Sequence, residues 1–332
     1  MAETEGKKES PRPKRPSRPV RLLKGTFVLL KRLALLTALA LGTIELLSPS
    51  LNFSKGPGSH AFRSDTPLEN FSLTTESGRV LQSKRTEILT SDYRRLTVDA
   101  LSPDNLIGKA PLPLTIVVTG FLEPEWTLDQ FALRSQNAVI VYRSPRQERM
   151  LGPAWPNRLM LRDSLWLALT TNPVTKWYNL HQGLHEAPLD ISEIARWAVD
   201  ALGVERTRIN LIGLGSGGLL AAAAAERMQS MGLPARSLTM IYPPAELDSA
   251  IRDNLDLPEV LRDPASKALA FLYRRLDLSR HLPFITTSVK QLIIPINAFE
   301  LATYAALPAV TLAGENIKVR QVNVNYSGYY LN

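Results

Sequence analysis

Short apolar runs alternate with longer amphipathic stretches from Arg79 to the end of the chain. Two of these runs, residues 114–121 (LTIVVTGF) and 138–143 (AVIVYR), are rich in β-branched residues and have turn residues beyond them. This pattern predicts strands that are buried on both faces. Further strands are predicted at 237–242, 290–297 and 317–325. Because helical segments separate these runs, we expect an α/β domain with a central, mostly parallel sheet flanked by helices.

Residues between and before these runs predict the neighbouring elements. Residues 85–92 and 94–101 alternate between apolar and polar positions, and we expect them to pair as an antiparallel hairpin at a sheet edge. Asp190 followed by Glu193 is typical of a capping box, which predicts that a helix begins there. Gly203 stands where a left-handed residue would end that helix.

The amino-terminal part of the chain has a different pattern. Residues 1–19 hold four prolines and many charges without an apolar run, which predicts a disordered basic tail. Residues 20–48 begin as a basic amphipathic helix and carry no charge over 33–44, a length of about 18 Å against a hydrocarbon core of roughly 30 Å. Residues 49–78 are rich in Ser, Gly and Pro and are expected to be a linker. Residues 79–332 are then the folded domain.

Three interpretations of residues 20–48 remain open. A single-pass signal anchor fits if the segment is counted as 27–47, about 31 Å long, with Lys31 and Arg32 reaching the headgroups. A cleaved signal peptide fits the small-x-small pattern at 38–40, and a surface-lying or buried helix is the third possibility. We take the anchor as the working hypothesis. Its lipid-facing helix then leaves the basic amino terminus in the cytoplasm and the domain on the far, periplasmic or extracytoplasmic side.

Charge and composition narrow the choice of partners. Residues 1–50 contain ten Lys and Arg and four Asp and Glu, which accounts for +6 of the net charge of +8. The rest of the chain is nearly neutral, so a nucleic-acid partner is not expected. The chain has no cysteine, which excludes a disulfide framework, a thiolate metal site and a cysteine nucleophile.

The histidines offer little reason to expect a metal. His181 and His185 have the i, i+4 spacing of paired ligands on a helix, but Gly183 is expected to interrupt that helix. We therefore interpret both as solvated loop residues. His281 precedes Leu-Pro at an expected helix end, which favours a capping role. No bound metal and no cofactor are expected.

The most informative segment is the glycine turn at residues 213–218 (GLGSGG). Gly213, Gly215 and Gly218 match G-x-G-x-x-G after a strand and before a helix, the arrangement of dinucleotide-binding folds. Such folds place an acidic residue at the end of the next strand. Here that strand ends in Ile-Tyr-Pro-Pro, and the first carboxylate is Glu246. A nucleotide-cofactor protein that uses these three glycines remains an alternative.

The same strand, glycine turn and small-residue helix also resemble the central unit of the α/β-hydrolase family. The resemblance extends over most of residues 79–332. In that family a Gly-x-Ser-x-Gly-Gly turn carries the nucleophilic serine. The register with glycines on both sides places Gly215 at the position of that serine. A shift by one places Ser216 there instead, and Leu214 then stands where the family has a glycine.

The resemblance implies positions for the other catalytic groups as well. The family's histidine is expected after the last strand, where this chain has Tyr329, and tyrosine with an ordinary pKa near 10 cannot shuttle a proton at neutral pH. Glu300 occupies the position of the acid, and Asp248 is an alternative acid. The positions that resemble an oxyanion hole are Gly120, Phe121 and Ser216.

Together these features predict a membrane-anchored α/β-hydrolase-like protein that has lost catalysis. Such a pseudohydrolase would bind a small apolar ligand or a protein partner. The first alternative is an ester or acyl hydrolase with Ser216 as nucleophile and His185 or His281 as base. The second alternative is the nucleotide-cofactor protein.

Overall fold

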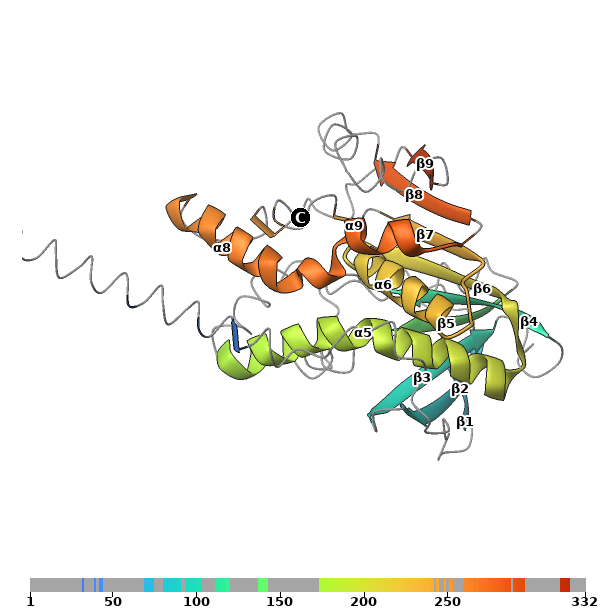
Figure 1. Ribbon diagram of the computed structural model, residues 1–332. Coiled ribbons are helices and arrows are strands. Elements are labelled where there is room, and N and C mark those ends of the chain that lie inside the picture. Colours follow the sequence, from blue (N-terminus) through green and yellow to red (C-terminus); the bar gives the residue numbers. More distant parts are fainter. Residues whose placement is uncertain are drawn as a thin grey trace, which may run out of the picture. The chain divides into compact units, whose positions relative to one another are not determined.

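The computed structural model describes part of the chain (Figure 1). The described residues are 69–74, 80–90, 94–102, 111–119, 137–142, 173–241, 243–244, 251–252, 259–287, 289–295 and 317–322, together with residues 32, 39, 42, 43 and 248. The chain divides into two compact units, Met1–Leu47 and Ser48–Asn332. Among the described residues, no helix has the length and apolar character needed to cross a membrane. The expected tail and nearly all of the expected anchor segment lie outside the described residues.

One sheet in the second unit joins nine strands of the described residues, in the order β1-β2-β3-β5-β4-β6-β7-β8-β9. The strands are β1 (Glu69–Thr74), β2 (Val80–Leu89), β3 (Arg95–Ser102), β4 (Leu112–Val118), β5 (Ala138–Tyr142), β6 (Val204–Leu214), β7 (Ser237–Ile241), β8 (Val289–Pro295) and β9 (Ile317–Val322). β1, β2 and β3 pair antiparallel, β3 pairs antiparallel with β5, and all pairs from β5 to β9 are parallel. The expected mostly parallel sheet is confirmed.

The expected hairpin forms between β2 and β3, with Leu89 opposite Arg95. It does not lie at the edge of the sheet, because β1 pairs with the outer side of β2, Glu69 opposite Arg85. β1 falls inside residues 49–78, which the composition predicts to be a linker. The sheet therefore begins before Arg79, and the short run ENFSLT is a strand despite its Ser- and Pro-rich surroundings.

The parallel strands β4 and β5 are buried on both faces, as their apolar runs predict. In β4, Ile116 and Val118 belong to the large core cluster that also contains residues of the helices. Val117 belongs to a second cluster, with Val139 and Leu214. Successive side chains of a strand point to opposite faces. The two clusters therefore lie on the two sides of the sheet, and β4 contributes to both.

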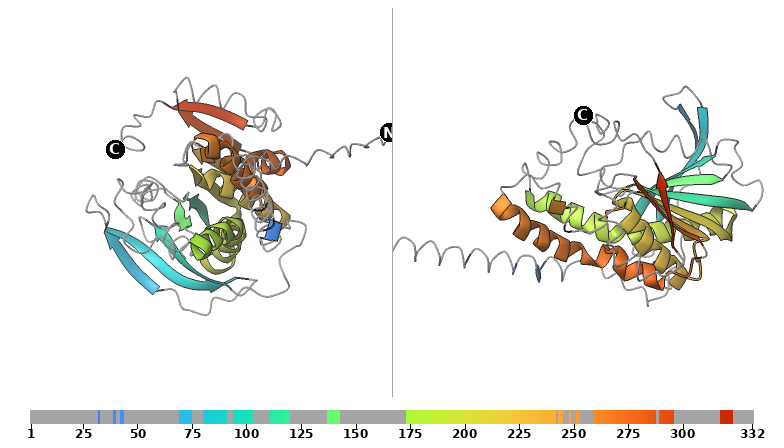
Figure 2. Two further views of the ribbon diagram at one scale, coloured as in Figure 1. Left: turned by 90° about the vertical axis from the view of Figure 1, so that its left-hand side faces the viewer. Right: turned by 90° about the horizontal axis from the view of Figure 1, so that it is seen from above.

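Four α-helices are described in the second unit with their bounds (Figures 1 and 2). They are α5 (Pro173–Leu202), α6 (Gly217–Ser230), α8 (Glu259–Tyr273) and α9 (Leu278–His281), with the short 3-10 turns η2 (Arg274–Leu276) and η3 (Leu282–Phe284). In α6 every residue from Gly217 to Ala225 is buried, because small side chains let this helix approach its neighbours closely. α5 ends as predicted before Gly203, whose φ of 70° lies in the left-handed region.

The start of α5 differs from the prediction. Asp190 and Glu193 do not form a capping box, because the helix begins at Pro173 and runs through both positions. Gly183 does not interrupt it, and Pro188 lies inside it. A proline in a helix interior removes one backbone hydrogen bond and costs about 3 kcal/mol. Burial of the following turns outweighs that cost, since the apolar residues there are fully or almost fully buried: Ile191, Ile194, Ala195, Trp197 and Ala198.

Candidate functional site

The glycine turn joins β6 to α6. Gly215 has a φ of 51°, in the left-handed region that favours glycine, and its N–H donates to the carbonyl of Ile241 in β7 at 2.8 Å. Ser216 has φ −62° and ψ −19°, which are ordinary helical values, and its side chain makes no capping hydrogen bond to α6. The residue that turns the chain from strand to helix is therefore Gly215.

Two further glycines allow the strand and the helix to touch. A Cβ on Gly213 would lie 2.5 Å from the Cα of Gly218 and 2.7 Å from the carbonyl oxygen of Gly217. A Cβ on Gly218 would lie 2.9 Å from the Cβ of Pro243. Contacts below 3.0 Å are not found for real Cβ atoms, so the space excludes any side chain at Gly213 unless the backbone moves.

The turn lies where the order of the strands reverses. After β4 the chain adds β5 on one side of it, and then, through α5, it adds β6 on the other side. In open α/β sheets, ligands bind beyond the carboxyl ends of the strands at such a point. We call the described residues there the carboxyl edge: Thr119, Tyr142, Gly215, Ser216 and Pro243.

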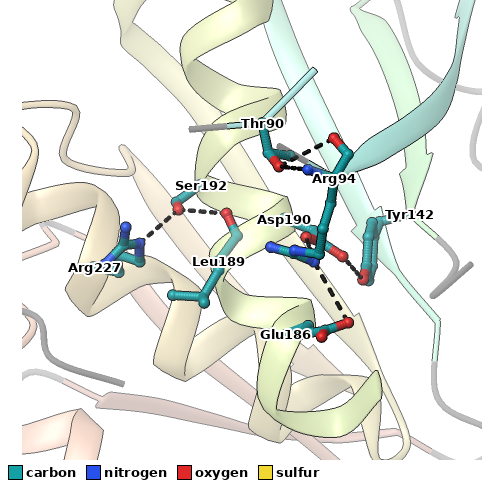
Figure 3. A network of polar contacts seen from close by, with 8 residues as sticks. All are labelled: Thr90, Arg94, Tyr142, Glu186, Leu189, Asp190, Ser192 and Arg227. Carbon is teal, nitrogen blue, oxygen red and sulfur yellow. Dashed lines mark hydrogen bonds and ion pairs between the residues drawn. The ribbon is translucent and has the colours of Figure 1, made fainter. Parts of the chain in front are cut away.

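A buried polar network adjoins the carboxyl edge (Figure 3). Arg94, in the turn between β2 and β3, forms an ion pair with Asp190 of α5 and lies 3.6 Å from Glu186, one turn earlier in that helix. The Tyr142 hydroxyl, at the end of β5, donates to the second carboxylate oxygen of Asp190 at 2.8 Å. The backbone of Tyr142 accepts hydrogen bonds from Thr119 N and Oγ1, at 3.4 and 3.2 Å. The network therefore connects the β2–β3 turn, α5 and the ends of β4 and β5.

Further hydrogen bonds hold the β2–β3 turn and the far side of α5. Thr90 N donates to the carbonyl of Arg94 at 2.8 Å, and Arg94 N donates to Thr90 Oγ1 at 2.9 Å, which closes the β2–β3 turn. On the far side of α5, Arg227 Nε of α6 donates to Ser192 Oγ at 3.0 Å, and Ser192 Oγ donates to the carbonyl of Leu189 at 2.7 Å (Figure 3). α5 is thus held both to the hairpin and to α6.

The acidity of Asp190 is set by burial against two favourable contacts. Its side chain is 1% exposed, and loss of water raises its pKa to about 7. The Arg94 charge and the Tyr142 hydrogen bond act in the opposite direction, and the Glu186 charge adds to the rise. Burial outweighs the ion pair, so Asp190 exchanges its proton near neutral pH.

His181 and His185 are not solvated loop residues. Both lie within α5, 3% and 0% exposed, because the helix continues through Gly183. Their ring centroids are 4.3 Å apart, and the His181 ring is 5.8 Å from that of Tyr273 in α8. Burial, together with the charges of His185 and Arg275, lowers the pKa of His181 to about 4. Among the described residues, no three metal-ligating side chains gather into a possible metal site.

His281 lies at the end of α9, as predicted, but its ring reaches other elements. Nδ1 is 2.7 Å from Glu226 Oε2 of α6, and Nε2 donates to the carbonyl of Arg275 at 2.7 Å. Glu226 follows Ser216 by ten residues, which is about 15 Å along a helix. His281 is therefore too distant from Ser216 to act as its base.

The other residues predicted for the site are divided between the described and remaining parts of the chain. Asp248 is helical and half-buried. Gly120, Phe121, Glu300 and Tyr329 lie outside the described residues. Arg94, Tyr142, Glu186 and the buried role of Asp190 are not evident from the sequence pattern. The one local signal was a carboxylate among apolar residues, in Ala-Pro-Leu-Asp-Ile.

No known protein family and no curated protein matches the chain. Among solved structures, it is similar to an acetyl xylan esterase from Paenibacillus sp. R4, with 14% identity, TM-score 0.49 and coverage of 86% of this chain and 93% of that one. Acetyl xylan esterase 1 from Thermoanaerobacterium sp. JW/SL YS485 has 12% identity and TM-score 0.45, over 78% of this chain and 80% of that one. A hyperthermophilic esterase from the archaeon Pyrobaculum calidifontis has 16% identity and TM-score 0.42, over 84% and 82%. The α/β fold described above rests on the strand order and directions themselves.

Proposed function

We propose that this chain is an α/β-hydrolase-like protein that binds a small neutral ligand at the carboxyl edge without hydrolysing it. The conformation of Gly215 carries the proposal. Gly215 is the left-handed residue of the turn, and the glycine two positions before it lies in backbone contact with Gly218. The hydrolase resemblance implies the nucleophilic serine at this position. Glycine has no side chain to attack a substrate, so the position supplies no nucleophile.

The side chains of the carboxyl edge support a neutral ligand. Thr119, Tyr142, Ser216 and Pro243 carry no charge at neutral pH, and Tyr142 keeps its hydroxyl on Asp190. Asp190 itself is buried behind the end of β5. The hydroxyls of Thr119 and Tyr142 are bonded inside the protein, so a ligand at this edge would meet the half-buried Ser216 and the uncharged surface around it.

Ester hydrolysis through Ser216 is the second candidate. His281 is excluded as the base because of its distance from Ser216. His181 and His185 lie buried on α5, which is hydrogen-bonded to α6 through Ser192. His185 Nδ1 is 2.9 Å from the carbonyl of His181, so that nitrogen carries the proton and Nε2 is the basic atom of the neutral ring. The helical conformation of Ser216 counts against this candidate, because the strained turn that exposes a nucleophile lies one residue earlier.

A turnover assay separates the two candidates. The full chain, Ser216→Ala and the control Ser230→Ala at the other end of α6 are assayed with p-nitrophenyl butyrate. We expect all three to match the rate without protein, and a fluorophosphonate probe to leave Ser216 unlabelled. A rate that falls at least about a hundredfold in Ser216→Ala alone would establish the hydrolase and direct the search for the base to His181 and His185.

Binding is tested separately from turnover. Saturation-transfer NMR with ethyl butyrate measures contact between a neutral ester and the protein. We expect a signal for the full chain that is lost in Ser216→Trp, because the indole covers the carboxyl edge, and kept in Ser230→Trp. Equal signals in the two variants would show that the ester binds elsewhere.

Membrane attachment through residues 20–48 is part of the proposal on the grounds of the sequence alone. The basic amphipathic start and the uncharged stretch after it predict a segment that salt does not release. We expect the full-length chain to remain with membranes after carbonate washing. Release of the intact chain would contradict a spanning segment, and release of a shortened chain would indicate cleavage near Ala40.

A further inference from the structure

We propose that Asp190 is a proton-sensitive positioning residue that holds the ends of β4 and β5 in place at the carboxyl edge. With its proton, Asp190 stays buried and donates that proton to the Tyr142 hydroxyl oxygen, which keeps Tyr142 against α5. Without its proton, the carboxylate favours opened forms of the network in which water reaches it. The effect on a ligand rests on the proposed function, but the positioning itself is measured without a ligand.

Geometry places Asp190 at the centre of one connected path. Arg94 approaches from the β2–β3 turn and the Tyr142 hydroxyl from β5, each bonded to a different carboxylate oxygen of Asp190. From Tyr142 the path continues through its carbonyl to Thr119 N and Oγ1 at the end of β4. A change at Asp190 therefore reaches the ends of two neighbouring parallel strands through two hydrogen-bonded steps.

Within the described residues, the charged and titratable groups that face Asp190 come from three elements. They are Arg94 from the β2–β3 turn, Tyr142 from β5 and Glu186 from its own helix. Glu186 lies 3.6 Å from the same Arg94 nitrogen that pairs with Asp190, so one guanidinium is shared by two carboxylates. Because that charge is shared, the buried carboxylate of Asp190 is compensated less than it would be in an exclusive ion pair.

The linkage between proton binding and opening of the network tells in which direction pH shifts the opening equilibrium. Opening of the network would return Asp190 to water, where the pKa of an aspartate is near 4, whereas burial holds it at about 7. Between these values the opened form binds fewer protons than the closed form, so a rise in pH favours opening. The change can reach about tenfold in the opening equilibrium per pH unit, because one proton is involved.

The decisive experiment is hydrogen exchange of the full chain, followed by mass spectrometry from pH 5.5 to 8 and corrected for intrinsic exchange rates. We expect the protection of peptides spanning 111–119 and 137–142 to fall from pH 5.5 to about 7 and to level off above that pH. Asp190→Asn keeps the shape of the side chain but cannot ionise, and its protection should not change with pH. Asp200→Asn, an exposed aspartate of the same helix, should behave as the unchanged chain does.

A second variant tests the path beyond Asp190. Tyr142→Phe removes the hydroxyl, so residues 111–119 should lose their pH response while residues 94–102, beside Arg94, keep it. A flat profile in the unchanged chain would overturn the proposal, as would an equal pH response in Asp190→Asn. Repeating the ethyl butyrate measurement at pH 6 and 8 then separates the two proposals. Absent binding with a normal exchange profile refutes the proposed function alone.

Discussion

Two regions hold the elements at the carboxyl edge, the glycine turn and the Arg94 network, and they use different kinds of contact. At the glycine turn, strand and helix touch backbone to backbone through Gly213, Gly217 and Gly218, which have no side chains. At the Arg94 network, long side chains join residues that are 96 and 48 positions apart in the chain. The first place has no room for an added atom and no group that titrates. The Arg94 network accepts a side chain of the same shape in place of Asp190, but its stability depends on whether Asp190 carries a proton.

The largest effect is expected at the glycine turn. Gly213→Ala puts a Cβ 2.5 Å from a backbone atom of Gly218, so strand and helix must separate. We expect a loss of at least about 3 kcal/mol in the free energy of unfolding, measured by urea denaturation and circular dichroism. Gly232→Ala is the control, because its φ of 73° is left-handed but no atom lies within 4 Å of the added Cβ. Equal stability of the two variants would show that the turn adapts.

Next in size is the loss of Arg94. Arg94→Met keeps the aliphatic stem but leaves Asp190 and Glu186 without their shared cation. We expect a cost of about 2–3 kcal/mol at pH 8, somewhat below the usual cost of breaking a buried pair, because Asp190 can take up a proton. The cost should shrink at pH 5.5, where Asp190 is already neutral. Arg95→Met is the matched control, since that side chain is 76% exposed and its contact with Glu87 is a surface pair worth little.

The pH dependence of stability is the third test. The pKa of Asp190 is raised on folding to about 7 from about 3.8, so its contribution is fully present below pH 3.8 and is lost as the pH rises through 7. Between pH 5 and 7 the free energy of unfolding of the unchanged chain should fall by up to about 2 kcal/mol relative to Asp190→Asn. Thermal and urea unfolding at several pH values measure the difference, with Asp200→Asn as control. Parallel plots of unfolding free energy against pH for the unchanged chain and Asp190→Asn would show that Asp190 does not cause the pH dependence.

The smallest effect is expected at Gly215. Gly215→Ala needs a left-handed conformation that costs an alanine about 1 kcal/mol, and this cost should not vary with pH. Gly203→Ala, at a φ of 70° in open space, provides the reference value. If Gly215→Ala lowers the free energy of unfolding as much as Gly213→Ala does, both glycines are needed for close backbone contact. The distinction between a left-handed position and a contact position then fails.

The two regions also differ in how far the sequence predicts them. The β6 strand, the turn and α6 follow from local signals, namely a β-branched run, closely spaced glycines and consecutive alanines. The strands from β4 to β9 were recognisable for the same reason. Asp190 was misread as a helix cap because its real partners, Arg94 and Tyr142, are distant in the chain. The buried state of His181 and His185 was missed because packing against Tyr273 overrides the glycine between them.

Pro188 makes α5 easier to bend than a helix with an uninterrupted series of backbone hydrogen bonds. Proline cannot donate the helical hydrogen bond to the carbonyl of Leu184, so bending stiffness is lowest there. His181 and His185, against Tyr273 of α8, lie on one side of this compliant joint, and Asp190 lies on the other. A force applied to α8 is then absorbed as a bend at the joint. Arg94 pairs with Glu186 before the joint and with Asp190 after it, so such a bend reaches the polar network beside the carboxyl edge.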